Sequence, residues 1–448
     1  MMTLRSTVLA VSIAGITVLS RGVQAQILPE RRLVAGVLLL AHPFEALRRA
    51  PQWALASSPS ASTSGMDAPD FDLTNARQVQ LLADGRIITL SSIGSRLVVF
   101  APDGRPERVL GRQGRGPGEL MAPSGLTRTR GDTLLIPDAS NNRLNWVVPS
   151  KGFVRTRPLP ALPPLAGVRS VRPAGSLNTG ELVLSTAGVV QAGLGGAGAV
   201  TRPTASVIML TSDGARATIV ATVPDLEVRD IETRFRGRRS SDSRPLLFTR
   251  YATVTAWDTV VATGSGDGYR IDLRNVRGVV RTTITVARPR RVVTSAMRDS
   301  MIARALQRLN APGRERMVDP EELRRQEVEA PAADSLPPYG SWFVTPNRTL
   351  WVLDAWAPGD RTRAATAFRQ DGAITARLTW SQPGDAVAFT DDAVVLRQTD
   401  ADDVVSLRVY RMQRPPRAAL APHARQHHGA GHQASRTGDW SGNASCAE

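Results

Sequence analysis

Val99–Val147 reads VFAPDGRPERVLGRQGRGPGELMAPSGLTRTRGDTLLIPDASNNRLNWV, and its pattern decides the fold. Short apolar runs are bounded by turn residues: one ends at Pro102-Asp103-Gly104, and a later one begins after Gly131-Asp132. No window in this stretch keeps the 3.6-residue period of an amphipathic helix. Turn residues at intervals of about eight to twelve positions are typical of antiparallel sheets. The stretch therefore predicts an all-β fold.

The same unit, a Gly, Asp or Asn turn followed by an apolar run, recurs along most of the chain. The apolar runs begin at Ile87, Leu134, Leu182, Val260, Leu350 and Val394. Three of the five intervals between these starting residues have the length of one four-stranded sheet. The two longer intervals contain residues 222–247 and 292–338. Six repeated units with two insertions are therefore expected within residues 67–413.

A family resemblance rests on the glycines and turn motifs of the opening stretch. It is carried by Gly111, Gly114, Gly118, Glu119, Leu120, Pro123 and Gly125, by residues 131–138, and by Asn141-Asn142-Arg143. This spacing resembles an NHL-type repeat, which implies that the units are the blades of a six-bladed β-propeller. Such blades host enzymes, ligand binders and protein-binding platforms alike, so the resemblance does not choose among these functions.

The two ends of the predicted propeller suggest how it closes. The last unit ends after Tyr410, one strand short of four. Phe71-Asp72-Leu73 precedes the first unit and has no partner there. We therefore expect this segment to supply the missing outer strand, which would leave only short edges exposed.

The second insertion, residues 292–338 before the fifth blade, is expected to be helical. Its apolar residues at helical spacing are Met297, Met301, Ile302, Ala305, Leu306 and Leu309. Asp319 and Pro320 form a favourable helix start, with Asp319 as the N-cap. The Met-containing stripe is interpreted as packing onto the propeller.

The first 25 residues have the pattern of a secretory signal peptide. Arg5 precedes the apolar run Val8–Leu19, which is too short to span a bilayer comfortably, and Val23-Gln24-Ala25 offers a cleavage site. An uncleaved anchor is the alternative. We expect an exported protein, periplasmic or extracellular, with no transmembrane segment in the mature chain.

Two further segments flank the predicted propeller. Residues 26–66 are expected to be a linker, and the apolar run Leu33–Ala41 within them to be a short helix on the body or part of that linker. Residues 414–448 lack an apolar period and are expected to be disordered. They contain Cys446, the only cysteine, so no disulfide within the chain and no cysteine zinc site is expected.

The formal charge of +16 comes almost entirely from arginine, because Lys151 is the only lysine. The chain is also rich in Ala, Gly and Pro, and we interpret this combination as the bias of a GC-rich genome rather than as a polyanion site. Only 5% of the residues are aromatic, whereas single-strand nucleic-acid binders combine cations with aromatic stacking platforms. We expect no nucleic-acid partner, and a monomer.

Histidine chemistry is excluded from the predicted blades. His42 precedes them, and the other histidines lie in the tail, at His423, His427, His428 and His432. A Ser-His-Asp or Cys-His mechanism needs an imidazole beside the nucleophile, and histidine-ligated zinc needs several imidazoles. No catalytic residue is assigned, and the leading expectation is a protein without enzymatic activity or cofactor.

Calcium is the alternative, because it needs only oxygen ligands. Six-bladed hydrolases similar to lactonases hold calcium in the central channel with Asp, Asn and Glu, and the matching candidates here are Asp138, Asn141, Asp258 and Asp354. Asp138 and Asn141 also lie where the repeat needs turn residues that hydrogen-bond nearby backbone. The alternative function is therefore a calcium-dependent, lactonase-like hydrolase or lyase with its site in the channel.

Arginines of the first insertion are the candidate ligand-binding residues. They are Arg229, Arg234, Arg236, Arg238, Arg239 and Arg244, in a segment expected to be a loop. Loops on a rigid scaffold often carry binding function, and guanidinium groups suit an anionic glycan, a phosphate or an acidic peptide. The opposing interpretation is a solvated loop in an arginine-rich chain. The leading hypothesis is an exported non-catalytic module that binds a protein, a peptide or another anionic ligand.

Overall fold

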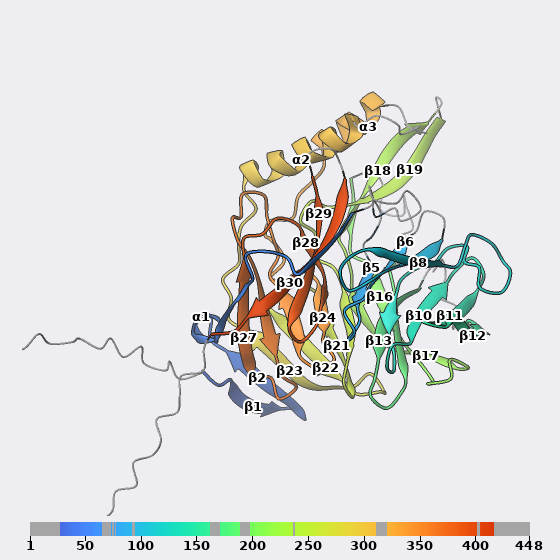
Figure 1. Ribbon diagram of the computed structural model, residues 1–448. Coiled ribbons are helices and arrows are strands. Elements are labelled where there is room, and N and C mark those ends of the chain that lie inside the picture. The colour runs from blue at the N-terminus through green and yellow to red at the C-terminus, as the bar shows by residue number, and fades with distance from the viewer. Residues whose placement is uncertain are drawn as a thin grey trace, which may run out of the picture. The chain divides into compact units, whose positions relative to one another are not determined.

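The computed structural model describes residues 27–64, 73, 76, 78–91, 95–161, 171–188, 198–235, 238–310, 320–400 and 404–415. These residues belong to one unit of the chain, Gln24–Pro415. The predicted signal peptide lies outside the described residues, and so does the predicted tail apart from Arg414 and Pro415. Most of the described chain forms strands in small, mainly antiparallel sheets, which confirms the all-β prediction (Figure 1).

Three four-stranded antiparallel sheets follow one another in the first half of the described chain. The first contains β5 (Gln78–Leu81), β6 (Ile87–Ser91), β7 (Arg96–Phe100) and β8 (Pro106–Leu110). The second contains β9 (Thr127–Arg128), β10 (Leu134–Asp138), β11 (Arg143–Val148) and β12 (Gly152–Pro158). The third contains β13 (Val171–Ser176), β14 (Leu182–Thr186), β16 (Thr204–Leu210) and β17 (Ala217–Pro224).

The second half repeats this pattern. The fourth sheet contains β20 (Thr253–Trp257), β21 (Val260–Gly264), β22 (Arg270–Arg274) and β23 (Val280–Val286). The fifth contains β24 (Trp342–Val344), β25 (Leu350–Leu353), β26 (Arg363–Phe368) and β27 (Ile374–Trp380). The sixth group contains β28 (Asp385–Phe389), β29 (Ala393–Thr399) and β30 (Val405–Gln413). The second strand of each group begins at, or next to, one of the six apolar runs that the sequence singles out.

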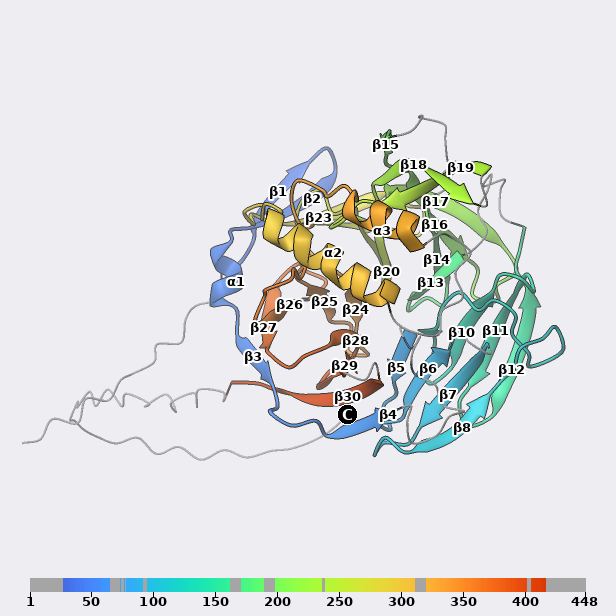
Figure 2. The ribbon, with the colours of Figure 1, turned by 90° about the horizontal axis from the view of Figure 1, so that it is seen from above.

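The core lies between neighbouring sheets, because the inner strands are buried on both faces. In β6, Ile87 packs against residues of the sixth group, whereas the adjacent Ile88 packs against the second sheet. This follows from the alternation of side chains along a strand, and it explains why the central strands are continuously apolar. Further clusters link the second sheet through to the sixth group. Figure 2 shows the sheets placed around a common centre.

The N-terminal strap, defined here as residues 27–64, differs from the predicted linker. It contains β1 (Glu30–Val34), β2 (Val37–His42), the helix α1 (Glu45–Arg49), β3 (Gln52–Leu55) and β4 (Ala61–Ser64). β2 pairs in parallel with β23, and β3 pairs in parallel with β27. The prediction of a short helix at Leu33–Ala41 is wrong, because Ala35 and Gly36 adopt positive φ angles that turn the run back on itself as the β1–β2 hairpin.

The strand that completes the sixth group is β4, which pairs antiparallel with β30. The prediction therefore placed the closing strand about ten residues too late in the chain. Thr63 of β4 is buried, and serine and threonine satisfy the ladder of β30 without an apolar pattern of their own. Leu73 is buried between the first sheet and the sixth group, and Phe71 and Asp72 lie outside the described residues.

Two additional structures rise from the sheets on the same side of the molecule (Figure 1). β15 (Val200–Thr201), β18 (Val228–Phe235) and β19 (Arg238–Pro245) form a three-stranded sheet. The arginine-rich segment is thus a β-hairpin and not the expected loop. Two helices, α2 (Ser295–Asn310) and α3 (Pro320–Val328), lie between β23 and β24. The predicted N-cap Asp319 lies outside the described residues.

Candidate functional site

A cavity of about 1250 Å³ is bounded by the first strand of each of the six strand groups described above. Those strands are β5, β9, β13, β20, β24 and β28. Several of them are short, with two residues in β9 and three in β24, so turns and loops form much of the wall. The cavity is large enough for a small-molecule ligand or a short segment of a peptide.

Charged side chains line the cavity, and most of them are paired. Arg348 lies 2.9 Å from Asp258, and Arg363 lies 2.9 Å from Asp385. Arg128 and Arg130 also line the wall, and neither forms an ion pair with another described residue. A guanidinium group keeps its charge at any physiological pH, so these two side chains give the wall a positive potential.

The wall also has uncharged donors and aromatic surface. Burial raises the pKa of the Tyr251 hydroxyl, and a hydrogen bond with Ser341 lowers it to a smaller extent. The hydroxyl is therefore protonated at neutral pH and can donate a hydrogen bond. Trp356 presents a half-buried indole ring to the same cavity.

The helix α2 reaches the rim of this cavity. The guanidinium of Arg304 in α2 lies 4.8 Å from the centroid of the Trp356 ring, and that of Arg363 lies 4.7 Å from it. Both distances fall within the range of cation–π contacts. Viewed from above, α2 passes over the region between β20 and β26 (Figure 2). α2 therefore lies beside the part of the cavity lining that contains Trp356 and Arg363.

Asp138 and Asn141, two of the calcium candidates, have the structural role that the sequence left open. Asp138 is buried and accepts hydrogen bonds from the backbone N–H groups of Met121 and Ala122, at 3.0 and 2.9 Å. The Asn141 amide donates to the same carboxylate at 2.7 Å. These contacts hold the Gly111–Gly118 link against the second sheet, and the pair does not line the central cavity.

Asp258 and Asp354, the other two candidates, both line the cavity but bind different arginines. Asp258 forms the ion pair with Arg348, and Asp354 lies 2.8 Å from Arg288 and also pairs with Arg377. The structure thus brings Asp138 and Asn141 into contact, whereas Asp258 and Asp354 share only the lining of the cavity. Among the described residues, no group of three or more His, Cys, Asp or Glu side chains could hold a metal ion.

The candidate arginines lie along the β18–β19 hairpin. The strand register pairs Arg229 with Arg244, and Arg234 with Arg239. Arg244 lies 3.5 Å from Glu327, which links the hairpin to α3. Arg238 is the first residue of β19, at the tip of the hairpin, where it pairs with Phe235. Arg236 lies outside the described residues.

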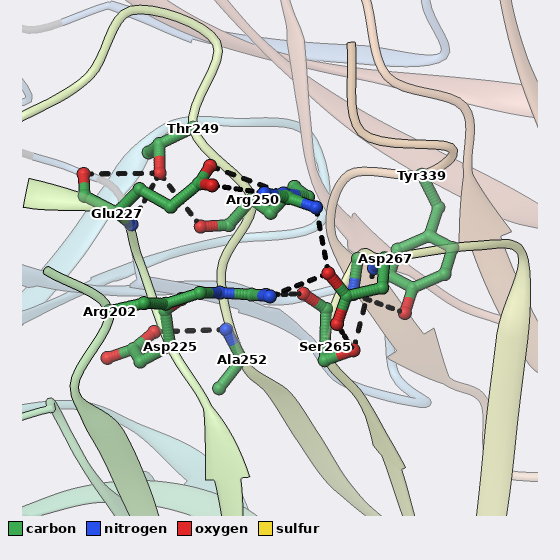
Figure 3. A network of polar contacts seen from close by, with 10 residues as sticks. Arg202, Asp225, Glu227, Thr249, Arg250, Ala252, Ser265, Asp267 and Tyr339 are labelled. Atoms are coloured by element: carbon green, nitrogen blue, oxygen red, sulfur yellow. Dashed lines mark hydrogen bonds and ion pairs between the residues drawn. The ribbon is translucent and has the colours of Figure 1, made fainter. Parts of the chain in front are cut away.

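A polar network fixes the base of this hairpin to the fourth sheet (Figure 3). Asp225 accepts from the backbone N–H of Ala252 at 2.9 Å, and Glu227 binds the Arg250 guanidinium, so the two limbs are joined. Arg202 and Arg250 both reach Oδ1 of Asp267, at 2.6 and 2.9 Å. The hairpin therefore stands on a charged and hydrogen-bonded base.

Two carboxylates of this network, Glu227 and Asp267, have a lowered pKa. The hydrogen bond from Arg250 holds the pKa of Glu227 below its usual range, despite partial burial. Burial raises the pKa of Asp267, but hydrogen bonds from Ser265 and Arg202 and the nearby positive charges outweigh it, so the pKa is lowered. The base of the hairpin consequently keeps its ion pairs in mildly acidic solution.

Sequence reasoning missed the residues that line the cavity. Arg128 lies in the inner strand just before one of the repeated turns, so its place in the unit was a usable signal. Trp356 and Arg363 flank the turn between β25 and β26, and their sequence neighbourhood has no motif that marks them. The contact between Trp356 and α2 depends on residues about fifty positions apart.

No protein-family profile and no curated protein sequence matches the chain. Similar solved structures include a protein described as exported from Bacteroides fragilis, with 11% identity, a TM-score of 0.41, and coverage of 84% of this chain and 99% of that one. Regucalcin, a calcium-binding protein from Agrobacterium tumefaciens, has 11% identity, a TM-score of 0.37, and coverage of 82% and 97%. The Swd1 β-propeller domain of Myceliophteria thermophila has 10% identity, a TM-score of 0.31, and coverage of 75% and 96%.

These similarities are too distant to indicate what the chain binds or catalyses. In the described part of the chain, no helix is long and apolar enough to cross a membrane.

Proposed function

We propose that the protein is an exported, monomeric six-bladed β-propeller that acts as a non-catalytic binding module for acidic protein or peptide segments. The six groups of strands are the blades, and α2 and α3 form a helical insertion before the fifth blade. The binding face is the side that carries the β18–β19 hairpin and the helices. The arginines of the hairpin and the adjacent mouth of the cavity would hold the ligand.

One observation carries this proposal, namely that the hairpin register places arginine opposite arginine twice. Like charges directly opposite each other on neighbouring strands destabilise a hairpin. Of Arg229 and Arg244, the two hairpin arginines whose side chains the structure describes, Arg244 has an ion-pair partner, Glu327. An acidic segment lying along the hairpin would remove this repulsion and gain charge-assisted hydrogen bonds.

The test uses the double variant Arg234→Ser/Arg239→Ser and a fluorescent peptide of about ten glutamates. Charge-assisted hydrogen bonds contribute about 1.5–3 kcal/mol each, so the double variant should bind at least about tenfold more weakly. Its affinity should also depend less on salt concentration, because fewer charges are involved. Fluorescence anisotropy measures both effects.

The control is Arg277→Ser/Arg281→Ser, which removes the same charge from exposed positions near the start of β23. This variant should bind like the unmodified protein. Equal loss of affinity in the two double variants would show that only net charge matters and would reject the hairpin as the site.

A second candidate function, a calcium-dependent lactonase-like hydrolase or lyase, is favoured by the presence of Asp258 and Asp354 in the lining of the central cavity. Calcium would have to replace Arg348 at Asp258. A ligand that binds only the folded form raises the melting temperature by mass action. A rise with Ca²⁺ over EDTA that is lost in Asp258→Asn would support the enzyme, and the absence of any rise would support the binding module.

A further inference from the structure

A second, smaller cavity of about 230 Å³ lies where the helices join the sheets. Its wall is formed by the loop Gly266–Gly268 between β21 and β22, by residues 286–291 that lead from β23 towards α2, and by residues 335–338 that return from α3.

Four arginines and one carboxylate line this small cavity. The arginines are Arg250, Arg288, Arg290 and Arg291, and the carboxylate is that of Asp267. Three of the arginines come from a single short run, Ala287-Arg-Pro-Arg-Arg291, which the sequence reasoning passed over. Such a density of guanidinium groups around a closed space is typical of oxyanion recognition.

The ion pairs around the cavity leave an excess of positive charge. Asp267 binds Arg202 and Arg250, and Glu227 also binds Arg250 (Figure 3). Asp354 binds Arg288 and Arg377, and Asp360 binds Arg291. With Arg290, six guanidinium groups thus surround these four carboxylates and that of Asp334, whose charge also acts on Arg250. Each guanidinium has five N–H donors, so donors remain after these pairs are made.

Arg290 differs from the other three arginines of the wall. It is exposed, and it forms no ion pair or hydrogen bond with another described side chain. Its charge is therefore available to a ligand without breaking an existing pair. Gly268 offers a second point of access, because a Cβ atom built there would have no neighbour within 4 Å.

The cavity lies between the two ends of the helical segment. Beside the cavity, the segment that leads into α2 is hydrogen-bonded to the segment that follows α3. The backbone N–H of Val293 donates to the carbonyl of Asp334 at 3.0 Å, and that of Leu336 donates to the carbonyl of Arg291 at 2.8 Å. Arg288 also donates to the carbonyl of Pro338 at 3.0 Å. An anion held here would contact both limbs of the helical segment.

We propose that this cavity is a binding site for a phosphate group, either as inorganic phosphate or as a small phosphomonoester. The excess positive charge and the remaining guanidinium donors bind the dianion. This site does not depend on what the hairpin or the central cavity binds.

The experiment is calorimetric titration of the whole protein with inorganic phosphate, and separately with glycerol phosphate. Sodium chloride at matched ionic strength shows any general salt effect. Saturable binding of one phosphate group per chain is expected, with no equivalent heat from chloride. Binding of inorganic phosphate alone would assign the free ion, and tighter binding of the ester would assign a phosphomonoester.

Two variants test the wall. Arg290→Gln should weaken phosphate binding about tenfold, because it removes a charged donor without breaking an ion pair. Gly268→Asp adds a carboxylate to the open space of the wall and should abolish binding while the melting temperature stays close to that of the unmodified protein. The matched control is Arg281→Gln, an exposed arginine of β23 outside the cavity wall, which should leave phosphate affinity unchanged.

The proposal is overturned if phosphate and chloride give the same response, or if Arg281→Gln weakens binding as much as Arg290→Gln does. It is also overturned if Gly268→Asp folds normally and still binds phosphate with undiminished affinity.

Discussion

The outer strands of the first three sheets and those of the last three have different neighbours. β8, β12 and β17 end their sheets, and much of β12 is exposed to solvent. β23, β27 and β30 instead pair with β2, β3 and β4 of the strap, so their outer backbone groups are satisfied within the chain. An open strand edge can pair with another molecule unless charge or covering prevents it.

The two halves prevent edge pairing in different ways. β12 carries Arg155 and Arg157, and β8 carries Glu107 and Arg108, so these open edges present charge. β27 and β30 are more apolar and alternate buried with half-buried residues under the strap. The comparison teaches that the strap is a structural component of the second half, whose outer strands it covers. In the first half, charge protects the edges of β8 and β12, whereas β17 has no charged residue.

The largest expected effect comes from deleting the strap. Without residues 27–64, β30 loses β4, and the buried side chains of Leu40, Leu47 and Leu55 are lost from the core. We expect the chain to lose its cooperative thermal transition, which circular dichroism would show. Deleting only residues 27–36 removes the exposed strand β1 and should leave the transition nearly unchanged. Similar behaviour of the two deletions would contradict the comparison.

A smaller effect is expected from shortening one buried side chain of the strap. Leu40 is 1% exposed and packs with residues of the fourth and fifth sheets. Leu40→Ala should lower the free energy of unfolding by about 3 kcal/mol, since it removes buried methyl groups and leaves a cavity. Leu33→Ala, at a position 75% exposed, should change it by less than about 0.5 kcal/mol. Urea unfolding of the two variants measures the difference, and equal values would show that Leu40 does not anchor the strap.

The first sheet offers a test of whether it too depends on the strap. A Cβ atom at Gly104 would lie 2.1 Å from the carbonyl oxygen of Ser62 in β4, and Gly104 has a φ of 91°. Gly104→Ala should therefore cost about 2 kcal/mol or more, because backbone must move as well as adopt a strained conformation. Gly359→Ala, with a similar φ of 93° and open space around its Cβ, isolates the conformational cost of about 1 kcal/mol.

If the two glycine variants lose the same stability in urea, the strap does not press on the first sheet. The difference between the two halves would then be larger, since the strap would stabilise the last three sheets alone.

A strand of this fold was predictable from the sequence when the residues that it pairs with are close to it in the chain. The second strands of the units were predictable because each follows its own turn, as at Ile87 and Leu134. The strap was not, because β4 (Ala-Ser-Thr-Ser) has no apolar pattern and its partner β30 lies more than 300 residues away. A short polar segment forms a strand there because β30 supplies the ladder.

The candidate site divides in the same way. The turn role of Asp138 was predictable, since its partners Met121 and Ala122 belong to the same repeat. The hairpin form of the arginine-rich segment was not predictable, because arginine and serine have no strong strand pattern. The small cavity brings Arg250 together with Arg288 and with residues after α3, and no sequence period relates these segments.

The smallest expected effect is a pH dependence that the strap alone introduces. His42 at the end of β2 is buried, and its Nε2 lies 2.8 Å from the carbonyl oxygen of Gly372. Nδ1 is buried and has no hydrogen-bond partner among the described residues. Burial lowers the pKa of His42, and the hydrogen bond to Gly372 offsets this only in part.

Because the pKa of His42 is lower in the folded chain than its ordinary value of about 6.5, the unfolded chain takes up the proton first. The strap therefore has its full stability above about pH 6.5 and loses stability as the pH falls towards the folded pKa. The slope for one proton is at most about 1.4 kcal/mol per pH unit. The neighbouring Asp371 stays ionised in this range, because the hydrogen bond from Arg369 lowers its pKa.

The variant His42→Gln removes this titration and keeps an N–H donor for the Gly372 carbonyl. Its unfolding free energy should change less with pH than that of the unmodified protein between about pH 6.5 and 5. The carboxylates titrate equally in both proteins, so the difference between the two urea-unfolding curves reports His42 alone. Parallel curves would mean that the ring accepts its proton without cost, and the strap would then cover the second half without making it sensitive to acid.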